Sequence, residues 1–149
     1  MAKHEPVELT DEQIAEENKF LEGLPRVNWA AFLLPPIWGP ANGFWVTILF
    51  YPVWILADNM FYSAVYFPSP ISVTLAIIVA ILLFAGTLAF AIVSQPLAAH
   101  RAEERGIDRA TYLRRQRYWA IGCFIAVLIM LALATYYNLE IRPGLEGEY

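Results

Sequence analysis

Two long apolar runs without a charged side chain dominate the second half of the chain. One extends over residues 71–94 and the other over residues 118–137. A helix needs about 20 apolar residues to cross the roughly 30 Å hydrocarbon core of a bilayer. Aromatic side chains flank the second run at both ends, as is typical of segments that end at a membrane–water interface. Both runs are predicted to be transmembrane helices.

A third apolar run, over residues 44–64, is less regular. It contains Pro52 in its middle and Asp58 toward its far end. Proline removes a backbone N–H donor and its ring clashes with the preceding turn, so Pro52 is expected to kink the helix. Kinked helices are tolerated in lipid when neighbouring groups satisfy the freed carbonyl. We interpret this run as a third span.

The segment over residues 28–38, "NWAAFLLPPIW", is too short to cross a bilayer. Asn28 is a good helix N-cap, and Pro35 and Pro36 interrupt the apolar pattern. It is interpreted as an interfacial or partly re-entrant helix that turns through "GPANG" into the first span. The alternative is an irregular lead-in.

The first 26 residues are polar and acidic and are predicted to carry a short amphipathic helix. Thr10 and Gln13 have the spacing of a capping box, which places the helix start at Asp11. Gly23 and Pro25 predict its end near Glu22. A solvated helix is favoured over one that docks on a partner. A third possibility is packing on the chain's own arginine-rich loop, because the two carry opposite charges.

That loop, over residues 95–117, is predicted to form an elbow of two helices. Pro96 is expected to start the first helix and Gly106 to end it. Asp108 is the predicted N-cap of the second, which continues into the last span. Three arginines close to that span are expected to contact lipid headgroups: Arg114, Arg115 and Arg117. Charge that only sets the membrane topology is the favoured alternative.

Composition and charge support an all-α integral membrane bundle. The chain is 58% hydrophobic and only 16% charged, which is too apolar for an ordinary soluble domain. Residues 27–100 contain no lysine or arginine, whereas the 95–117 loop is rich in arginine. The positive-inside rule therefore predicts that residues 1–26 and this loop are cytoplasmic. The membrane domain is predicted over residues 27–137, with a short external tail over 138–149, in a bacterial inner membrane.

Two separated stretches carry a resemblance to a known group. "NWAAF" and "IWGPAN" at residues 28–42, followed by "QRYWA" at residues 116–120, resemble the pattern Asn-Trp-(Gly/Ala)-Ala-Phe, Ile-Trp-Gly and Gln-Arg-x-Trp-Ala. This pattern is typical of a group of small uncharacterised bacterial multi-span membrane proteins. The resemblance implies a small membrane protein and supplies neither a reaction nor a ligand.

The sequence offers little catalytic chemistry. The two histidines lie outside the predicted spans and Cys123 is the single cysteine, so the sequence predicts no haem site within the membrane, internal disulfide or zinc site. No P-loop, H-E-x-x-H or G-x-S-x-G motif is present. We therefore expect a non-enzymatic protein without a cofactor and without a nucleic-acid partner. Its expected partners are membrane lipids and other membrane subunits or further copies of itself.

Two candidate sites remain. Asparagines and tryptophans near the start of the membrane domain could line a groove for a lipid or a quinone-like molecule: Asn28, Trp29, Trp38, Asn42 and Trp45. Capping amides and interface anchors are the favoured alternative. Asp58 is the one ionisable group in the apolar region and a candidate ion site. Its position close to the end of a span favours a solvated carboxylate instead.

Two functional hypotheses follow. The first is a non-catalytic accessory or scaffolding subunit of a membrane complex. The second is a small transporter or channel component in which Asp58 lines an oligomeric pore.

Overall fold

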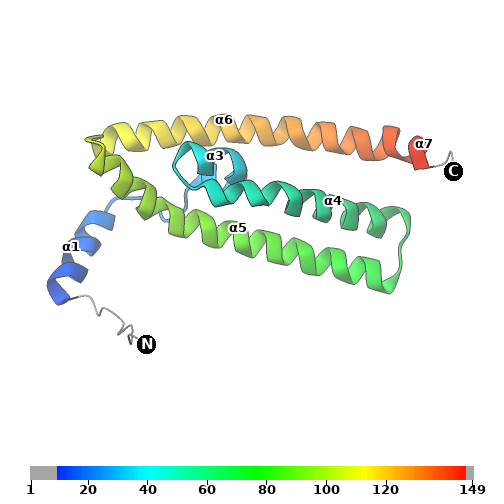
Figure 1. Cartoon of the computed structure of the whole chain (residues 1–149), viewed down its shortest axis with the longest axis horizontal. Coiled ribbons are helices and arrows are strands. Elements are labelled where there is room, and N and C mark those ends of the chain that lie inside the picture. Colours follow the sequence, from blue (N-terminus) through cyan, green and yellow to red (C-terminus); the bar gives the residue numbers. More distant parts are fainter. Residues whose placement is uncertain (1–9, 147–149) are drawn as a thin grey trace, which may run out of the picture.

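The computed structural model describes residues 10–146, which form helices and no strand. Three stretches are long and apolar enough to cross a membrane: Trp45–Tyr66, Pro70–Glu104 and Arg109–Leu145. In Figure 1 they run along the long axis of the molecule, with α1 beyond one end and α7 at the other. The predicted all-α helical bundle is confirmed.

Helix α1 covers Asp11–Leu21 and begins as predicted. Thr10 Oγ1 accepts a hydrogen bond from the backbone N–H of Gln13, and the Gln13 side chain accepts one from the N–H of Thr10. This reciprocal capping box satisfies two N–H groups that the first turn leaves without intrahelical partners. Gly23 follows the helix with a φ of 81°.

The segment predicted as one interfacial or partly re-entrant helix is two short helices, α2 (Trp29–Leu33) and α3 (Pro35–Ala41). They meet at Leu34, which is non-helical because the residue before a proline is sterically disfavoured in the α region. Pro35 then occupies the first turn of α3, where a missing N–H is tolerated.

One face of these two helices forms the core of the molecule, while Trp29 and Ile37 on the other side are exposed. Ala30, Ala31, Leu34 and Trp38 are at most 1% exposed. Helix α2 packs against both α5 (Pro70–Glu104) and α6 (Arg109–Tyr136). In Figure 1 it is the light-blue segment beside α3, between α5 and α6. Alanines on α5 complete the core and allow the close approach: Ala91, Ala98, Ala99 and Ala102.

The first span begins with the 3₁₀ helix η1 (Trp45–Leu49) and continues as α4 (Phe50–Tyr66). Pro52 does not stand in the middle of an α-helix as expected, because the α-helical part starts only at Phe50. Pro52 therefore lies in the first turn, where its ring has no preceding α-helical turn to clash with.

Helix α5 is longer than predicted because it continues through Pro96 to Glu104 instead of restarting there. Figure 1 shows that α5 changes direction in its yellow-green part, toward the start of α6. Such a bend is the usual result of an internal proline, whose ring pushes against the carbonyl one turn earlier. Gly106 ends the helix region with a φ of 74°, as predicted.

Helix α6 starts at its predicted N-cap and also runs beyond its predicted end. Asp108 accepts a hydrogen bond from the backbone N–H of Thr111 at 3.0 Å, and this bond lowers the pKa of the carboxyl group. At the far end, the π-helical turn η2 (Tyr137–Ile141) and α7 (Arg142–Glu146) continue the helix into the predicted tail, whose last three residues lie outside the described part of the chain.

Candidate functional site

A largely buried network of three side-chain amides joins the helices in the described part of the chain. Asn28 is 3% exposed, and its Nδ2 donates to Oε1 of Gln95 at 2.7 Å and to Oε1 of Gln116 at 3.1 Å. Its Oδ1 accepts from the backbone N–H of Ala31, which caps α2. The backbone N–H of Asn28 donates to the carbonyl oxygen of Ala91. Asn28 therefore ties α2 to α5 and α6 at once.

Two aromatic donors complete this network. Trp38 is fully buried and donates from Nε1 to Oε1 of Gln116 at 2.9 Å. The hydroxyl of Tyr112 donates to Oε1 of Gln95 at 3.2 Å. We refer to these five residues, Asn28, Trp38, Gln95, Tyr112 and Gln116, as the amide network. Buried hydrogen bonds of this kind fix one relative position of the helices that share them.

The amide network lies beside a hollow of about 320 Å³. Its walls come from the chain before α2, from the start of α2, and from α5 and α6. The lining residues are Gly23, Pro25, Val27, Asn28, Trp29, Gln95, Leu113, Gln116, Arg117 and Ala120. The hollow therefore combines polar amides with apolar walls and one arginine.

The structure separates the five residues of the predicted groove. Asn28 and Trp29 line the hollow, while Trp38 is sealed in the core behind it. Trp29 and Trp45 are 60% and 69% exposed, as expected of interface anchors. The side-chain Nδ2 of Asn42 caps α3 by donating to the backbone carbonyl oxygen of Trp38. The backbone carbonyl oxygen of Asn42 accepts a hydrogen bond from Arg101. Asn42 and Trp45 do not line the hollow.

Helix α1 packs on the chain's own arginine-rich loop region, whereas the favoured expectation has it free in solvent. Nε2 of His100 on α5 pairs with the Glu17 carboxylate at 3.0 Å, and the Phe20 ring stacks on the imidazole with centroids 3.8 Å apart. Arg109 donates to the carbonyl oxygens of Phe20 and Glu22. The described contacts with the loop are thus the polar contact of His100 with Glu17, a ring stack, the Arg109 guanidinium over the Phe20 ring, and two backbone acceptors.

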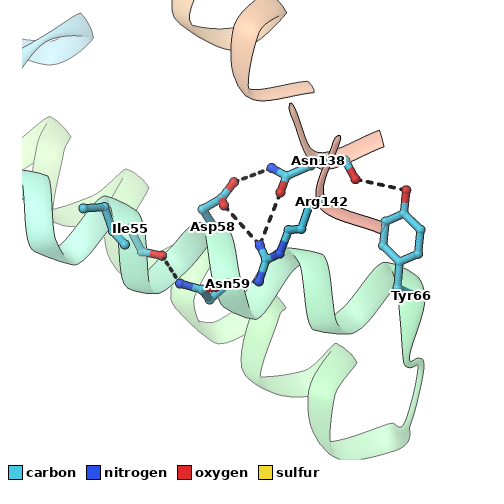
Figure 2. Close-up of polar contacts among 6 residues, drawn as sticks. All are labelled: Ile55, Asp58, Asn59, Tyr66, Asn138 and Arg142. Atoms are coloured by element: carbon cyan, nitrogen blue, oxygen red, sulfur yellow. Dashed lines mark hydrogen bonds and ion pairs between the residues drawn. The ribbon is translucent and has the colours of Figure 1, made fainter. Parts of the chain in front are cut away.

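Asp58 is the second candidate, and it has a cationic partner (Figure 2). Its Oδ1 accepts from Asn138 at 2.8 Å, and its Oδ2 lies 3.5 Å from a guanidinium nitrogen of Arg142. Arg142 also donates to Oδ1 of Asn59 at 2.7 Å and lies over the Tyr62 ring. We call this group the outer clasp, because it joins α4 to η2 and α7. Asp58 is thus a paired carboxylate.

The outer clasp is a contact between two helices that otherwise stand apart. Helix α4 packs along α5 and hardly touches α6. An apolar cleft of about 510 Å³ lies between α4 and α6, with Asp58 among its lining residues. Leu34 forms part of its floor, and Ala57 and Ala134 line opposite sides.

The three arginines predicted at the headgroup level are exposed on the first turns of α6. Arg117 lines the hollow, Arg115 lines a separate apolar groove with Trp119 and Gly122, and Arg114 lines neither. Lipid contact by these side chains stays a prediction.

Several residues of these sites escaped the sequence interpretation. The sequence interpretation assigns no role to Gln95 or Arg142. A glutamine at the end of an apolar span and a single arginine after the last span are nevertheless both signals of a specific partner. Gln116 entered only through the resemblance. Residues 10–146 contain no cluster of three or more metal-binding side chains.

Comparison with known proteins does not identify the chain: no family model, curated protein or solved structure matches it significantly.

Proposed function

We propose that this chain is a non-catalytic accessory or scaffolding subunit of a complex in a bacterial inner membrane. Residues 1–26 and the loop between α5 and α6 would face the cytoplasm, and α7 would lie on the external side. The arginine-rich loop supports this orientation through the positive-inside rule.

The observation that carries the proposal is the cleft between α4 and α6. The three candidate spans have only 11%, 11% and 6% of their most apolar windows buried within the chain. Most of their apolar surface is left for lipid or for other helices. A cleft of about 510 Å³ with alanines on both sides admits close approach by a further helix, because small side chains let helix backbones come together.

Helix α1 supports the same role from outside the membrane. Its Glu17 and Phe20 contact α5, while Asp11, Glu12 and Glu16 remain exposed. A docked helix with an acidic outer face is a surface that a basic segment of a partner can bind without a large ordering cost.

A pore role for Asp58 has less support. An intramembrane carboxylate that carries ions needs its charge available to them. Here Arg142 and Asn138 already contact both carboxylate oxygens.

Native mass spectrometry after mild detergent extraction of the full-length chain tests the proposal. We expect the chain within a larger assembly that contains other subunits. The variant Ala134→Phe fills the cleft and should release the chain from that assembly, whereas Ala85→Phe adds the same ring on an exposed face of α5 outside the cleft and should not. Recovery of the chain only as a monomer, or equal effects of both variants, would contradict the proposal.

A liposome flux measurement separates the pore hypothesis. We expect no ion flux above the protein-free background, and no difference between the wild-type chain and Asp58→Asn. Flux that disappears in Asp58→Asn would favour the transporter or channel and overturn the scaffolding role.

A further inference from the structure

The orientation of each amide in the network follows from groups that can only donate. The backbone N–H of Ala31 and the indole Nε1–H of Trp38 have no acceptor capacity. The side-chain atom of Asn28 that faces the Ala31 N–H must therefore be its oxygen, Oδ1. In the same way, the side-chain atom of Gln116 that faces the Trp38 indole must be its oxygen, Oε1. Nδ2 of Asn28 must then donate to both glutamines, so Gln95 also presents its oxygen to the network.

As a result, the Nε2 groups of Gln95 and Gln116 point away from the network. Within residues 10–146, neither nitrogen has a hydrogen-bond acceptor, although Gln95 is only 2% exposed. No side-chain nitrogen or oxygen in this part of the chain is both sealed from solvent and unpaired. The two NH₂ groups therefore open onto the hollow that both side chains line.

The charged group at this hollow is also a donor. Arg117 lines it and has no carboxylate partner among the described residues. Among residues 10–146, the lining of the site thus offers amide N–H groups and a guanidinium and no carboxylate. Such a set binds an anionic acceptor, and arginine forms paired hydrogen bonds with phosphate oxygens.

The walls and position of the hollow restrict the source of that anion. Val27, Leu113 and Ala120 give it apolar sides, and the largely exposed Trp29 stands at its edge. A free anion gains nothing from such walls, whereas an amphiphile buries its glycerol and upper acyl carbons against them. The volume of about 320 Å³ suits a small headgroup and lies at the lower end of the range for ligand pockets.

We propose that this hollow is a specific site for the phosphate headgroup of an anionic phospholipid from the cytoplasmic leaflet. Gln95, Gln116 and Arg117 donate to the phosphate oxygens, and the apolar walls hold the start of the acyl chains. A zwitterionic lipid with a quaternary ammonium group binds more weakly, because that cation would lie near the Arg117 guanidinium.

The test uses the purified full-length chain in detergent and three probes: phosphatidylglycerol, phosphatidylcholine and inorganic phosphate. Native mass spectrometry titrations give the affinity of each. We expect one tightly retained phosphatidylglycerol per chain, at least about tenfold weaker binding of phosphatidylcholine, and no saturable binding of inorganic phosphate.

The variant Gln116→Glu keeps the oxygen that accepts from Trp38 and Asn28 and replaces the NH₂ donor by a second oxygen. It should lower the affinity for phosphatidylglycerol by about tenfold or more. Arg117→Gln should do the same, whereas Arg114→Gln removes an equal charge outside the hollow and should leave the affinity unchanged.

Circular dichroism checks that each variant is folded. If Gln116→Glu does not fold, the comparison of Arg117→Gln with Arg114→Gln tests by itself whether the hollow is a specific site for anionic phospholipid. Equal losses in that pair would mean nonspecific attraction of anionic lipid and would overturn the proposal. Inorganic phosphate that binds as tightly as the lipid would also overturn it, since the site would then recognise a free anion. Neither outcome depends on whether the chain is part of a larger complex.

Discussion

Trp29 and Trp38 show how far the same residue type can differ in role within one short segment. Trp29 is 60% exposed and offers its ring to the membrane interface, whereas Trp38 is fully buried. Trp38 donates to Gln116 and its ring stacks on Phe44 with centroids 5.7 Å apart. The position of each side chain relative to α5 and α6 decides its role.

Replacement of Trp38 by phenylalanine removes the indole donor and leaves a small void. We expect Trp38→Phe to lower the free energy of unfolding by about 2 kcal/mol, since a hydrogen bond contributes about 1 kcal/mol and a cavity adds to the loss. Denaturant-induced unfolding in detergent micelles measures the change. Trp29→Phe is the matched control and should change stability by less than about 0.5 kcal/mol. Similar losses in both variants would contradict the assigned role of Trp38.

At the scale of the elements, a helix start that is set by a capping side chain depends on neighbours in sequence and follows from the sequence alone. Thr10 and Asp108 each cap a helix through a side chain three residues from its donor. The helix start expected at Pro96 is wrong, because α5 continues through this proline. The helix beyond Pro96 has buried alanines that pack in the core, Ala98, Ala99 and Ala102, and this tertiary packing offsets the lost hydrogen bond.

The contact between α3 and η1 depends on a glycine. A Cβ on Gly39 would clash with the Thr47 hydroxyl and lie 2.8 Å from the Thr47 Cβ, and Thr47 is itself 2% exposed. Because η1 would have to shift, we expect Gly39→Ala to lower the free energy of unfolding by about 1–3 kcal/mol. Thermal unfolding in detergent provides the measurement.

Gly86→Ala is the control for this prediction. Apart from the adjacent turns of α5 itself, no described atom lies within 4 Å of a Cβ added at Gly86. Alanine favours a helix over glycine, so this variant should be neutral or more stable by up to about 1 kcal/mol. A Gly39→Ala chain as stable as Gly86→Ala would show that α3 and η1 are not in close contact.

At the scale of the whole molecule, two sets of polar contacts hold the helices at opposite ends of the apolar region. The amide network joins α2 to α5 and α6, and the outer clasp joins α4 to η2 and α7 (Figure 2). The proposed orientation puts the amide network toward the cytoplasm and the outer clasp toward the outside.

Cysteine labelling in intact cells tests that orientation. In a Cys123→Ala background, Gly144→Cys should react with a membrane-impermeant maleimide from outside, because Gly144 lies in the exposed α7. Arg105→Cys, in the turn after α5, should react only after the inner membrane is opened. Reversed labelling would contradict the orientation, and labelling of both sites from outside would contradict a third span.

The sequence by itself determined the helical class, the three spans and the helix caps, because hydropathy and capping depend on residues close together along the chain. Only the tertiary structure decided the partners of Asn28, which lie 67 and 88 residues away, and the pairing of Asp58 with Arg142. It also placed α2 and α3 at the centre of the bundle. A polar side chain in an apolar region must find a partner, but hydropathy alone does not specify which one, and that choice requires the helices to be packed together.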